Sequence, residues 1–147
     1  MPDRPILVIE DSPEDFETTK RAFRRAGRRN PMLRCATGDE ALDFLHRRGR
    51  FVDPLESPRP SIILLDLNLP GTDGRDVLCE IKRTEPLARV PVVVLTTSTD
   101  HRDVAACYAA GANSYVEKPM DLDAFMDTIR RLSDYWFGVV VLPPRES

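Results

Sequence analysis

The chain has few of the residues that build disulfide frameworks or zinc sites. Its 147 residues include three cysteines and two histidines, and no CxxC motif occurs. A disulfide-stapled secreted domain and a zinc finger are therefore disfavoured, and a reducing cytoplasm fits the composition. We expect Cys35, Cys79 and Cys107 to be small core residues and His46 and His101 to lie on the surface.

Long apolar stretches and an excess of basic residues are also missing. The longest unbroken apolar runs, such as Ile62–Leu65 and Val139–Leu142, are far shorter than the ~20 residues of a membrane helix. No apolar segment of signal-peptide length follows Met1. A net charge of −3 gives no overall attraction to nucleic acid or to an anionic membrane. We therefore expect one soluble domain that binds neither.

Short apolar runs alternate with helical patterns along the chain. Ile6–Ile9, Ile62–Leu65 and Val92–Leu95 lack polar alternation, which predicts strands buried on both faces of a parallel sheet. Met32–Ala36 and Ser114–Glu117 are weaker strand candidates. Thirteen prolines stand mostly at the boundaries of these segments, so they mark element ends rather than disorder.

Five amphipathic helices are expected between and after these strands. The first runs from about Pro13 to Ala26, with Ser12 as its cap and Gly27 at its end. The others are marked by apolar residues in Ala41–Leu45, Val77–Ile81, Val104–Ala109 and Leu122–Leu132. This alternation predicts an α/β fold with a doubly wound parallel sheet. A long loop is expected over residues 47–59, and a tail after residue 135.

Polar side chains follow the predicted strands. Glu10 and Asp11 follow the first strand, and Asp66 and Asn68 follow the third. The carboxyl ends of parallel strands share one edge of the sheet, where ligands of such folds bind. Converging carboxylates repel one another unless a cation joins them, and Mg²⁺ prefers oxygen ligands of this kind. The sequence therefore predicts a magnesium site at this edge.

Hydroxyl and ammonium groups follow the remaining strands. Thr96 and Thr97 end the fourth strand, and Lys118 follows the fifth. A metal and a lysine can neutralise phosphoryl oxygens, a hydroxyl can hold one, and a carboxylate can be the nucleophile. Taken singly, Asp11 could be a helix cap, the threonines ordinary strand ends and Lys118 a surface lysine. Their joint placement favours phosphoryl chemistry.

Four segments resemble the receiver domain of bacterial two-component response regulators: Ile6–Asp11, Ile62–Gly74, Val92–Ser98 and Gly111–Pro119. They follow the order of the family and span nearly the whole chain. The resemblance implies a flavodoxin-like, five-stranded parallel sheet of strand order 2-1-3-4-5, with five helices and a carboxyl-terminal extension. Residues 1–135 would be the receiver domain and 136–147 the extension, with no output domain.

The resemblance also implies roles for individual residues. Asp66 would accept a phosphoryl group from a sensor histidine kinase. The Mg²⁺ ligands would be Glu10, Asp11, Asp66 and the carbonyl of Asn68. The phosphate-binding and switch residues would be Thr96, Thr97, Tyr115 and Lys118. The protein would signal by contact with a downstream protein, and it would not be an enzyme beyond its own phosphorylation and dephosphorylation.

A narrower resemblance is to the small stand-alone regulators paired with bacterial phytochrome kinases. It includes the Thr96-Thr97-Ser98 run and the Leu142-Pro143-Pro144 ending. In that subfamily the extension takes part in homodimers, which predicts a dimer contact at Trp136, Phe137, Val140 and Leu142. The alternative is that this apolar tail folds back on its own domain.

A basic stretch near the end of the first predicted helix also has two interpretations. It contains Lys20, Arg21, Arg24, Arg25, Arg28 and Arg29. It is either a solvated helix face or a docking patch for an acidic surface of the kinase.

Three other classes of protein fit less well. A phosphatase of the haloacid dehalogenase type needs a second aspartate two residues after the nucleophile, where this chain has Asn68. A flavodoxin-like cofactor binder needs a phosphate-binding loop after the first strand, but Glu10–Pro13 is acidic and lacks glycine. A pure interaction module would not need Asp66, Thr96 and Lys118 together.

Overall fold

The computed structural model describes residues 4–144 and confirms the predicted alternation of strands and helices. The strands are β1 (Ile6–Ile9), β2 (Met32–Cys35), β3 (Ile62–Leu65), β4 (Val92–Thr96) and β5 (Ser114–Glu117). The helices are α1 (Pro13–Arg25), α2 (Gly38–His46), α3 (Gly74–Lys82), α4 (His101–Ala110) and α5 (Leu122–Gly138). The long loop after α2 carries one short 3₁₀ turn, η1 (Gly49–Phe51), and a second, η2 (Leu87–Arg89), precedes β4.

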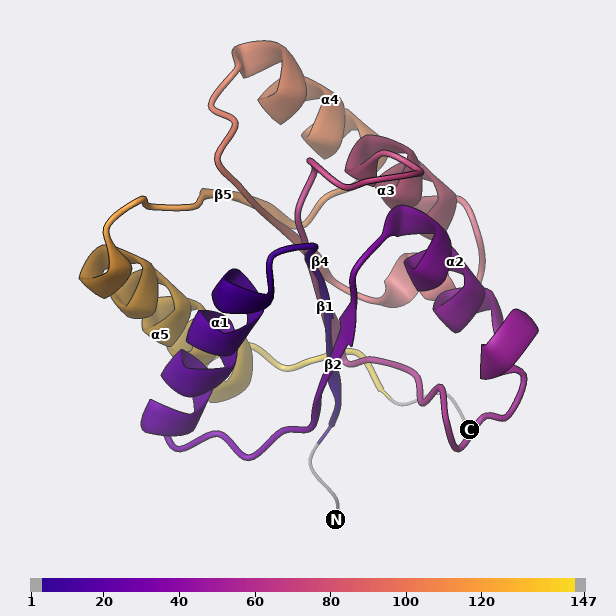
Figure 1. Ribbon diagram of the computed structural model, residues 1–147, viewed down its shortest axis with the longest axis horizontal. Coiled ribbons are helices and arrows are strands. Elements are labelled where there is room, and N and C mark those ends of the chain that lie inside the picture. Colours follow the sequence, from indigo (N-terminus) through magenta and orange to yellow (C-terminus); the bar gives the residue numbers. More distant parts are fainter. Residues whose placement is uncertain (1–3, 145–147) are drawn as a thin grey trace.

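All strand pairs are parallel, in the predicted order β2-β1-β3-β4-β5. The sheet separates α1 and α5 from α2, α3 and α4 (Figure 1). Leu7 and Ile63 pack in the layer with α2, α3 and α4, whereas Val8 and Leu64 pack in the layer with α1 and α5. Both faces of the central strands are covered, which explains their unbroken apolar sequences. No helix within residues 4–144 is long and apolar enough to cross a membrane.

The starts of two helices bring chain segments close to the carboxyl edge of the sheet. Ser12 Oγ accepts a hydrogen bond from the backbone N–H of Asp15, so Ser12 rather than Asp11 caps α1. At the start of α3, a Cβ on Gly74 would overlap the carbonyl oxygen of Asp66 and the Cα of Leu67. Only glycine allows α3 to begin this close to the end of β3.

Some expected burials are wrong. Cys35 and Cys107 are buried, but Cys79 is exposed. On α4, Ala105 and Tyr108 helped to predict the helix but are exposed, and Cys107 is its buried residue. Alanine favours a helix without marking which face is covered, because its side chain is small enough for either.

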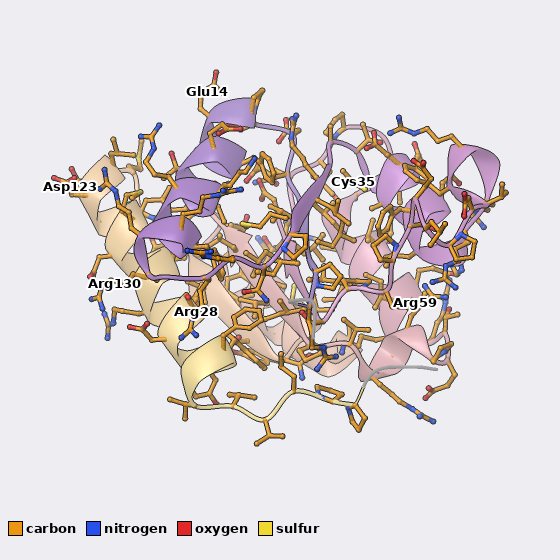
Figure 2. The ribbon with its side chains drawn as sticks, turned by 90° about the horizontal axis from the view of Figure 1, so that it is seen from below. Glu14, Arg28, Cys35, Arg59, Asp123 and Arg130 are labelled. Carbon is orange, nitrogen blue, oxygen red and sulfur yellow. The ribbon has the colours of Figure 1, made fainter. Side chains whose placement is uncertain are left out.

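Helix α5 runs to Gly138, past the expected boundary at residue 135, so Trp136 and Phe137 are helical. The apolar pattern is interrupted at Ser133, which is buried in the same stripe and accepts a hydrogen bond from Arg28 Nε at 3.2 Å (Figure 2). A polar residue in the buried stripe is the reason the helix seemed to end early. Arg28 therefore ties the end of the α1 segment to α5.

The four residues expected at a dimer contact lie against the layer formed by α1 and α5. Trp136 is buried there, and Phe137, Val140 and Leu142 are partly buried against it. The rings of Phe137 and Phe23 meet edge to face, with centroids 6.0 Å apart. Within residues 135–144, the large apolar side chains left exposed are Tyr135 at 53%, Val139 at 73% and Val141 at 94%. Residues 145–147 of the expected extension lie outside the described residues.

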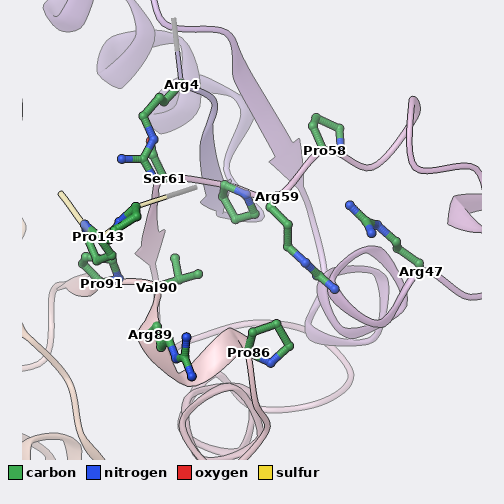
Figure 3. A pocket seen from close by; sticks show the side chains of 12 residues that line it. Arg4, Arg47, Pro58, Arg59, Ser61, Pro86, Arg89, Val90, Pro91 and Pro143 are labelled. Atoms are coloured by element: carbon green, nitrogen blue, oxygen red, sulfur yellow. The ribbon is translucent and has the colours of Figure 1, made fainter. Parts of the chain in front are cut away.

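The described part of the extension reaches the amino edge of the sheet. Pro143 and Pro144 line a cavity of about 240 Å³ there, together with Arg4, Arg59 and Pro91 (Figure 3). This cavity lies at the edge opposite the predicted carboxylates. This cavity is therefore separate from the candidate site.

Candidate functional site

Glu10, Asp11 and Asp66 meet at the carboxyl edge of the sheet, as predicted. Strands β1 and β3 are neighbours with Ile9 paired to Leu65, so the residues that follow them leave the sheet side by side. The backbone N–H of Asp66 donates to the carbonyl of Ile9 at 3.0 Å. One carboxylate oxygen from each of the three acids lies within 4.8 Å of the others. Glu10 and Asp66 are buried, and Asp11 is exposed.

Lys118 is buried among these carboxylates and is not a surface lysine. Its Nζ donates to Glu10 Oε1 at 2.6 Å and to Asp66 Oδ2 at 3.3 Å. Its backbone N–H donates to the carbonyl of Thr96 at 2.7 Å, which fixes the chain just after β5. Only 6% of the side chain is exposed. The ammonium therefore offsets the repulsion between two buried acids.

Asp15 also contacts Lys118, and the sequence analysis did not find it. Its Oδ2 accepts a hydrogen bond from Lys118 Nζ at 2.9 Å. Asp15 lies three residues after the cap Ser12, and side chains at that position can reach back over the start of a helix. The start of α1 directly follows the end of β1, so the spacing of Asp15 from Ser12 could have indicated that Asp15 lies near the site.

Three carboxylates share one ammonium, and the burial of the cluster together with these contacts shifts the pKa values of Glu10 and Lys118. Burial raises the pKa of Glu10 to about 7, although Lys118 opposes the shift. Burial alone would lower the pKa of Lys118, but its hydrogen bonds and its attraction to the acids outweigh this and raise the pKa above its usual value. The cluster therefore has an excess of negative charge that favours a proton or a further cation.

The donor atoms of this cluster fit a hard divalent cation. Each of the three acids offers a carboxylate oxygen, the kind of ligand that Mg²⁺ takes. Asn68, the fourth predicted ligand, stays next to the cluster because its backbone N–H donates to Asp66 Oδ1 at 3.3 Å. Oxygen donors and excess negative charge both suit Mg²⁺ better than a metal that prefers nitrogen or sulfur ligands.

The two predicted threonines lie in different environments. Thr96 is fully buried at the end of β4, and its Oγ1 has no hydrogen-bond partner among residues 4–144. Thr97 is exposed, because it lies just past the end of β4, where the chain leaves the sheet. Leaving a buried hydroxyl unpaired costs about 1–3 kcal/mol. Thr96 Oγ1 therefore has the capacity to bind a ligand oxygen.

Tyr115 is tied to the loop between β4 and α4. Its hydroxyl donates to the carbonyl of Ser98 at 2.8 Å. Ser98 Oγ donates to Asp103 at 2.6 Å, and Arg75 Nε donates to the same carboxylate at 2.7 Å. The hydrogen bond from Arg75 holds the pKa of Asp103 well below its usual value. One network thus connects β5, the loop after β4, α4 and α3.

This parallel sheet, with its acidic cluster and buried lysine at the carboxyl edge, has the arrangement that the sequence motifs predict for a receiver domain. Residues 6–130 match the family of the response regulator receiver domain, and the chain belongs to that family. The match extends across the whole sheet and includes Asp66, so the phosphatase alternative is set aside. The chain is a response regulator receiver, as its sequence motifs implied.

Relatives resemble the chain along nearly its full length. It is 38% identical over 142 residues to response regulator Rcp1 of Synechocystis sp., covering 97% of this chain and 95% of the relative. The crystal structure of the Mn²⁺-bound form of Rcp1 aligns with a TM-score of 0.90 and covers 96% of this chain and 99% of that one. The phosphorylated cyanobacterial phytochrome response regulator RcpA, 32% identical, aligns with a TM-score of 0.91 and covers 97% and 99%.

Proposed function

We propose that Asp66 accepts a phosphoryl group from the phosphohistidine of a sensor histidine kinase. The observation that carries this proposal is the position of Asp66: it is buried after β3, beside Glu10, Asp11 and Lys118. A carboxylate oxygen of Asp66 forms a bond to phosphorus while the phosphorus–nitrogen bond of the histidine breaks. The electron pair of that bond stays on the histidine, and Asp66 becomes an acyl phosphate.

The neighbouring residues prepare Asp66 for this step. Glu10, Asp11, Asp66 and the carbonyl of Asn68 would hold Mg²⁺. When bound, the ion supplies positive charge that offsets the charge of the phosphoryl oxygens. Lys118 supplies a second positive charge, and Thr96 Oγ1 donates a hydrogen bond to a phosphoryl oxygen. The divalent ion in the Mn²⁺-bound form of Rcp1 supports this assignment.

The switch would follow from the pairing of Thr96. When its hydroxyl turns to a phosphoryl oxygen, the loop after β4 moves with it, including Thr97 and Ser98. The hydrogen bond between Ser98 and the Tyr115 hydroxyl then breaks, and Tyr115 changes its position. This alters the surface next to Tyr108, whose hydroxyl accepts a hydrogen bond from the Tyr115 backbone N–H at 3.1 Å. A downstream protein would read that surface.

The kinase partner would be of the bacterial phytochrome kind, in the cytoplasm. The likeness to the phytochrome response regulator RcpA supports this pairing. A shallow groove on α1 is lined by Lys20, Arg21, Arg24 and Arg25 together with Glu17. This groove is the part of the basic stretch that an acidic surface of the kinase would contact, since Arg28 is engaged with Ser133.

We also propose that the chain forms a homodimer through α5 and the extension. Tyr135, Val139 and Val141 form an exposed apolar group there. Trp136, Phe137, Val140 and Leu142 support this group from the side of the domain. Several exposed apolar residues close together in the chain, here at the end of α5 and just after it, are typical of a contact surface, and a two-fold dimer is the commonest arrangement.

Phosphotransfer from purified histidine kinases tests the main proposal. The kinases of the same genome are autophosphorylated with labelled ATP and mixed with the chain, phytochrome-type kinases first. We expect label to move to the wild-type chain in Mg²⁺ and not to Asp66→Asn, nor to the wild type in EDTA. Label that persists on Asp66→Asn would overturn the assignment of the phosphoacceptor.

A further inference from the structure

Asp15 is a charged residue of the site to which the proposed mechanism gives no role. It contacts Lys118 Nζ at 2.9 Å from the first turn of α1. It is not part of the carboxylate cluster that would hold the metal ion. Its side chain is 34% exposed, whereas Glu10 and Asp66 are buried. Asp15 is therefore the partner of Lys118 that water can reach.

Lys118 has no hydrogen left for a new ligand. An ammonium group donates three hydrogen bonds, and those of Lys118 go to Glu10, Asp15 and Asp66. A phosphoryl oxygen can bind Lys118 only if one of these carboxylates is released. Of the two that remain carboxylates once Asp66 carries the phosphoryl group, Glu10 is buried, and releasing it would leave a buried acid without the ammonium, which is costly. Releasing Asp15 costs least, because its carboxylate can turn to water.

We propose that Asp15 is a positioning residue that holds Lys118 in the unphosphorylated state and competes with the phosphoryl group for it. The inference rests on the proposed phosphorylation of Asp66. The Asp15–Lys118 ion pair would then shift the equilibrium toward the unphosphorylated form. Removing the charge of Asp15 leaves one donor of Lys118 available and strengthens the binding of a phosphoryl group.

The backbone of Asp15 is well fixed, so a substitution of its side chain tests the ion pair alone. Its N–H is bound by Ser12 Oγ, and its carbonyl accepts a hydrogen bond from Thr19 Oγ1 at 2.8 Å. Glu14 is the matched control, because it is an exposed acid in the same turn of α1 whose carboxylate accepts a hydrogen bond from Ser12 Oγ instead. Asp15→Asn and Glu14→Gln remove the same charge from the same helix end.

The test is a titration of the full-length chain with beryllofluoride, a phosphoryl mimic, in saturating Mg²⁺ by calorimetry. We expect Asp15→Asn and Asp15→Ala to bind about fivefold more tightly than the wild type, the size of one partly exposed ion pair. Glu14→Gln should differ by less than about twofold. Mg²⁺ affinity, measured separately, should change no more in Asp15→Asn than in Glu14→Gln.

A Lys118→Ala background separates this role from a structural one. In that background Asp15→Asn should leave beryllofluoride affinity unchanged, because the ammonium for which Asp15 and beryllofluoride compete is no longer present. Equal effects of Asp15→Asn and Glu14→Gln, weaker binding in Asp15→Asn, or an effect that persists in Lys118→Ala would overturn the inference. A wild type that binds no beryllofluoride and accepts no phosphoryl group would instead overturn the proposed function.

Discussion

The two halves of the site differ in how their polar groups are satisfied. At the ends of β1 and β3, Glu10 and Asp66 are both hydrogen-bonded to Lys118. At the end of β4, the buried hydroxyl of Thr96 has no partner among the described residues. In the acidic half, formed by Glu10 and Asp66, the charge is thus offset by Lys118 of the same chain. In the hydroxyl half, Thr96 can still bind an oxygen of a ligand.

This difference separates the residues that stabilise the unphosphorylated fold from those that respond to the phosphoryl group. Removing the ammonium leaves two buried acids unpaired, which costs stability. The Thr96 hydroxyl makes no stabilising hydrogen bond in the unphosphorylated state, so removing it costs no stability. The same ligand would engage both halves, because a phosphoryl group on Asp66 offers oxygens to Lys118 and to Thr96.

The largest expected effect is that of Lys118→Ala on stability. Breaking a buried ion pair from one side costs about 3–5 kcal/mol, and Glu10 and Asp66 are both buried. We expect the free energy of unfolding in urea to fall by about 3 kcal/mol without metal and to recover partly in Mg²⁺. Lys82→Ala is the control, a lysine that binds backbone carbonyls away from the acids. A loss below about 1 kcal/mol would contradict the pairing.

The second prediction is a dependence of stability on pH. Burial raises the pKa of Glu10 from 4.5 to about 7, so the folded chain holds a proton that the unfolded chain has lost. The contribution of Glu10 is therefore fully present below pH 4.5 and is lost as the pH rises through about 7. We expect the metal-free chain to be less stable at pH 8 than at pH 6, and Glu10→Gln to show a flatter profile.

Mg²⁺ should reverse this dependence, because the ion takes the place of the proton. Its affinity should rise as the pH increases through about 7, the pKa of Glu10. Calorimetric titrations of Mg²⁺ in buffers of different ionisation enthalpy measure the proton released. Metal binding without proton release at pH 6.5 would show that Glu10 is already ionised in the folded chain.

Thr96→Val should change the free energy of unfolding least and the binding of a phosphoryl mimic most. Valine keeps the shape and removes the unpaired hydroxyl, so we expect the free energy of unfolding to stay equal or to rise by about 1 kcal/mol. Beryllofluoride should bind more weakly because a donor to its fluorine is gone. Loss of stability above about 1 kcal/mol would show that Thr96 already has a partner, and the contrast between the two halves would then fail.

The described part of the extension reaches the amino edge of the sheet, opposite the site, and changes there should leave both halves unchanged. We expect the wild type to run as a dimer of about 33 kDa in light scattering, twice the 16.6 kDa of one chain. Val139→Asp with Val141→Asp should weaken association because both exposed side chains gain charge, while Asp66 phosphorylation continues. Trp136→Ala should instead lower stability by about 3 kcal/mol. A wild type that is monomeric at high concentration would refute the dimer.

Much of this structure was predictable because its signals are local. Ile62–Leu65 is unbroken because β3 is covered on both faces, and Asp66 stands at a position that follows from the strand alone. Parallel pairing then brings Glu10 to Asp66, so a one-dimensional pattern predicted a three-dimensional cluster. The strand order followed from the family resemblance that the motifs carry, whereas the burial of Thr96 was not predicted.

Other features depend on contacts that no local pattern carries. Asp15 joins the site because α1 starts over the end of β1, and its role appears only when the distance to Lys118 is known. The end of α5 was misplaced because Ser133 is buried by a hydrogen bond from Arg28 across the chain. Trp136 is predicted at a dimer contact, and within one chain its side chain packs with Phe125 and Ile129 between the sheet and α5, which the apolar pattern of the tail alone does not indicate.

The central claim is that the phosphoryl group is carried by Asp66 and by no other acid of the cluster. The chain is treated with acetyl phosphate in Mg²⁺, reduced with borohydride to convert an acyl phosphate to an alcohol, and mapped by tandem mass spectrometry. The account predicts homoserine at position 66 alone, and none when EDTA replaces Mg²⁺. Reduction at Asp11 or Glu10, or unmodified Asp66 in a chain that has gained phosphate, would contradict it.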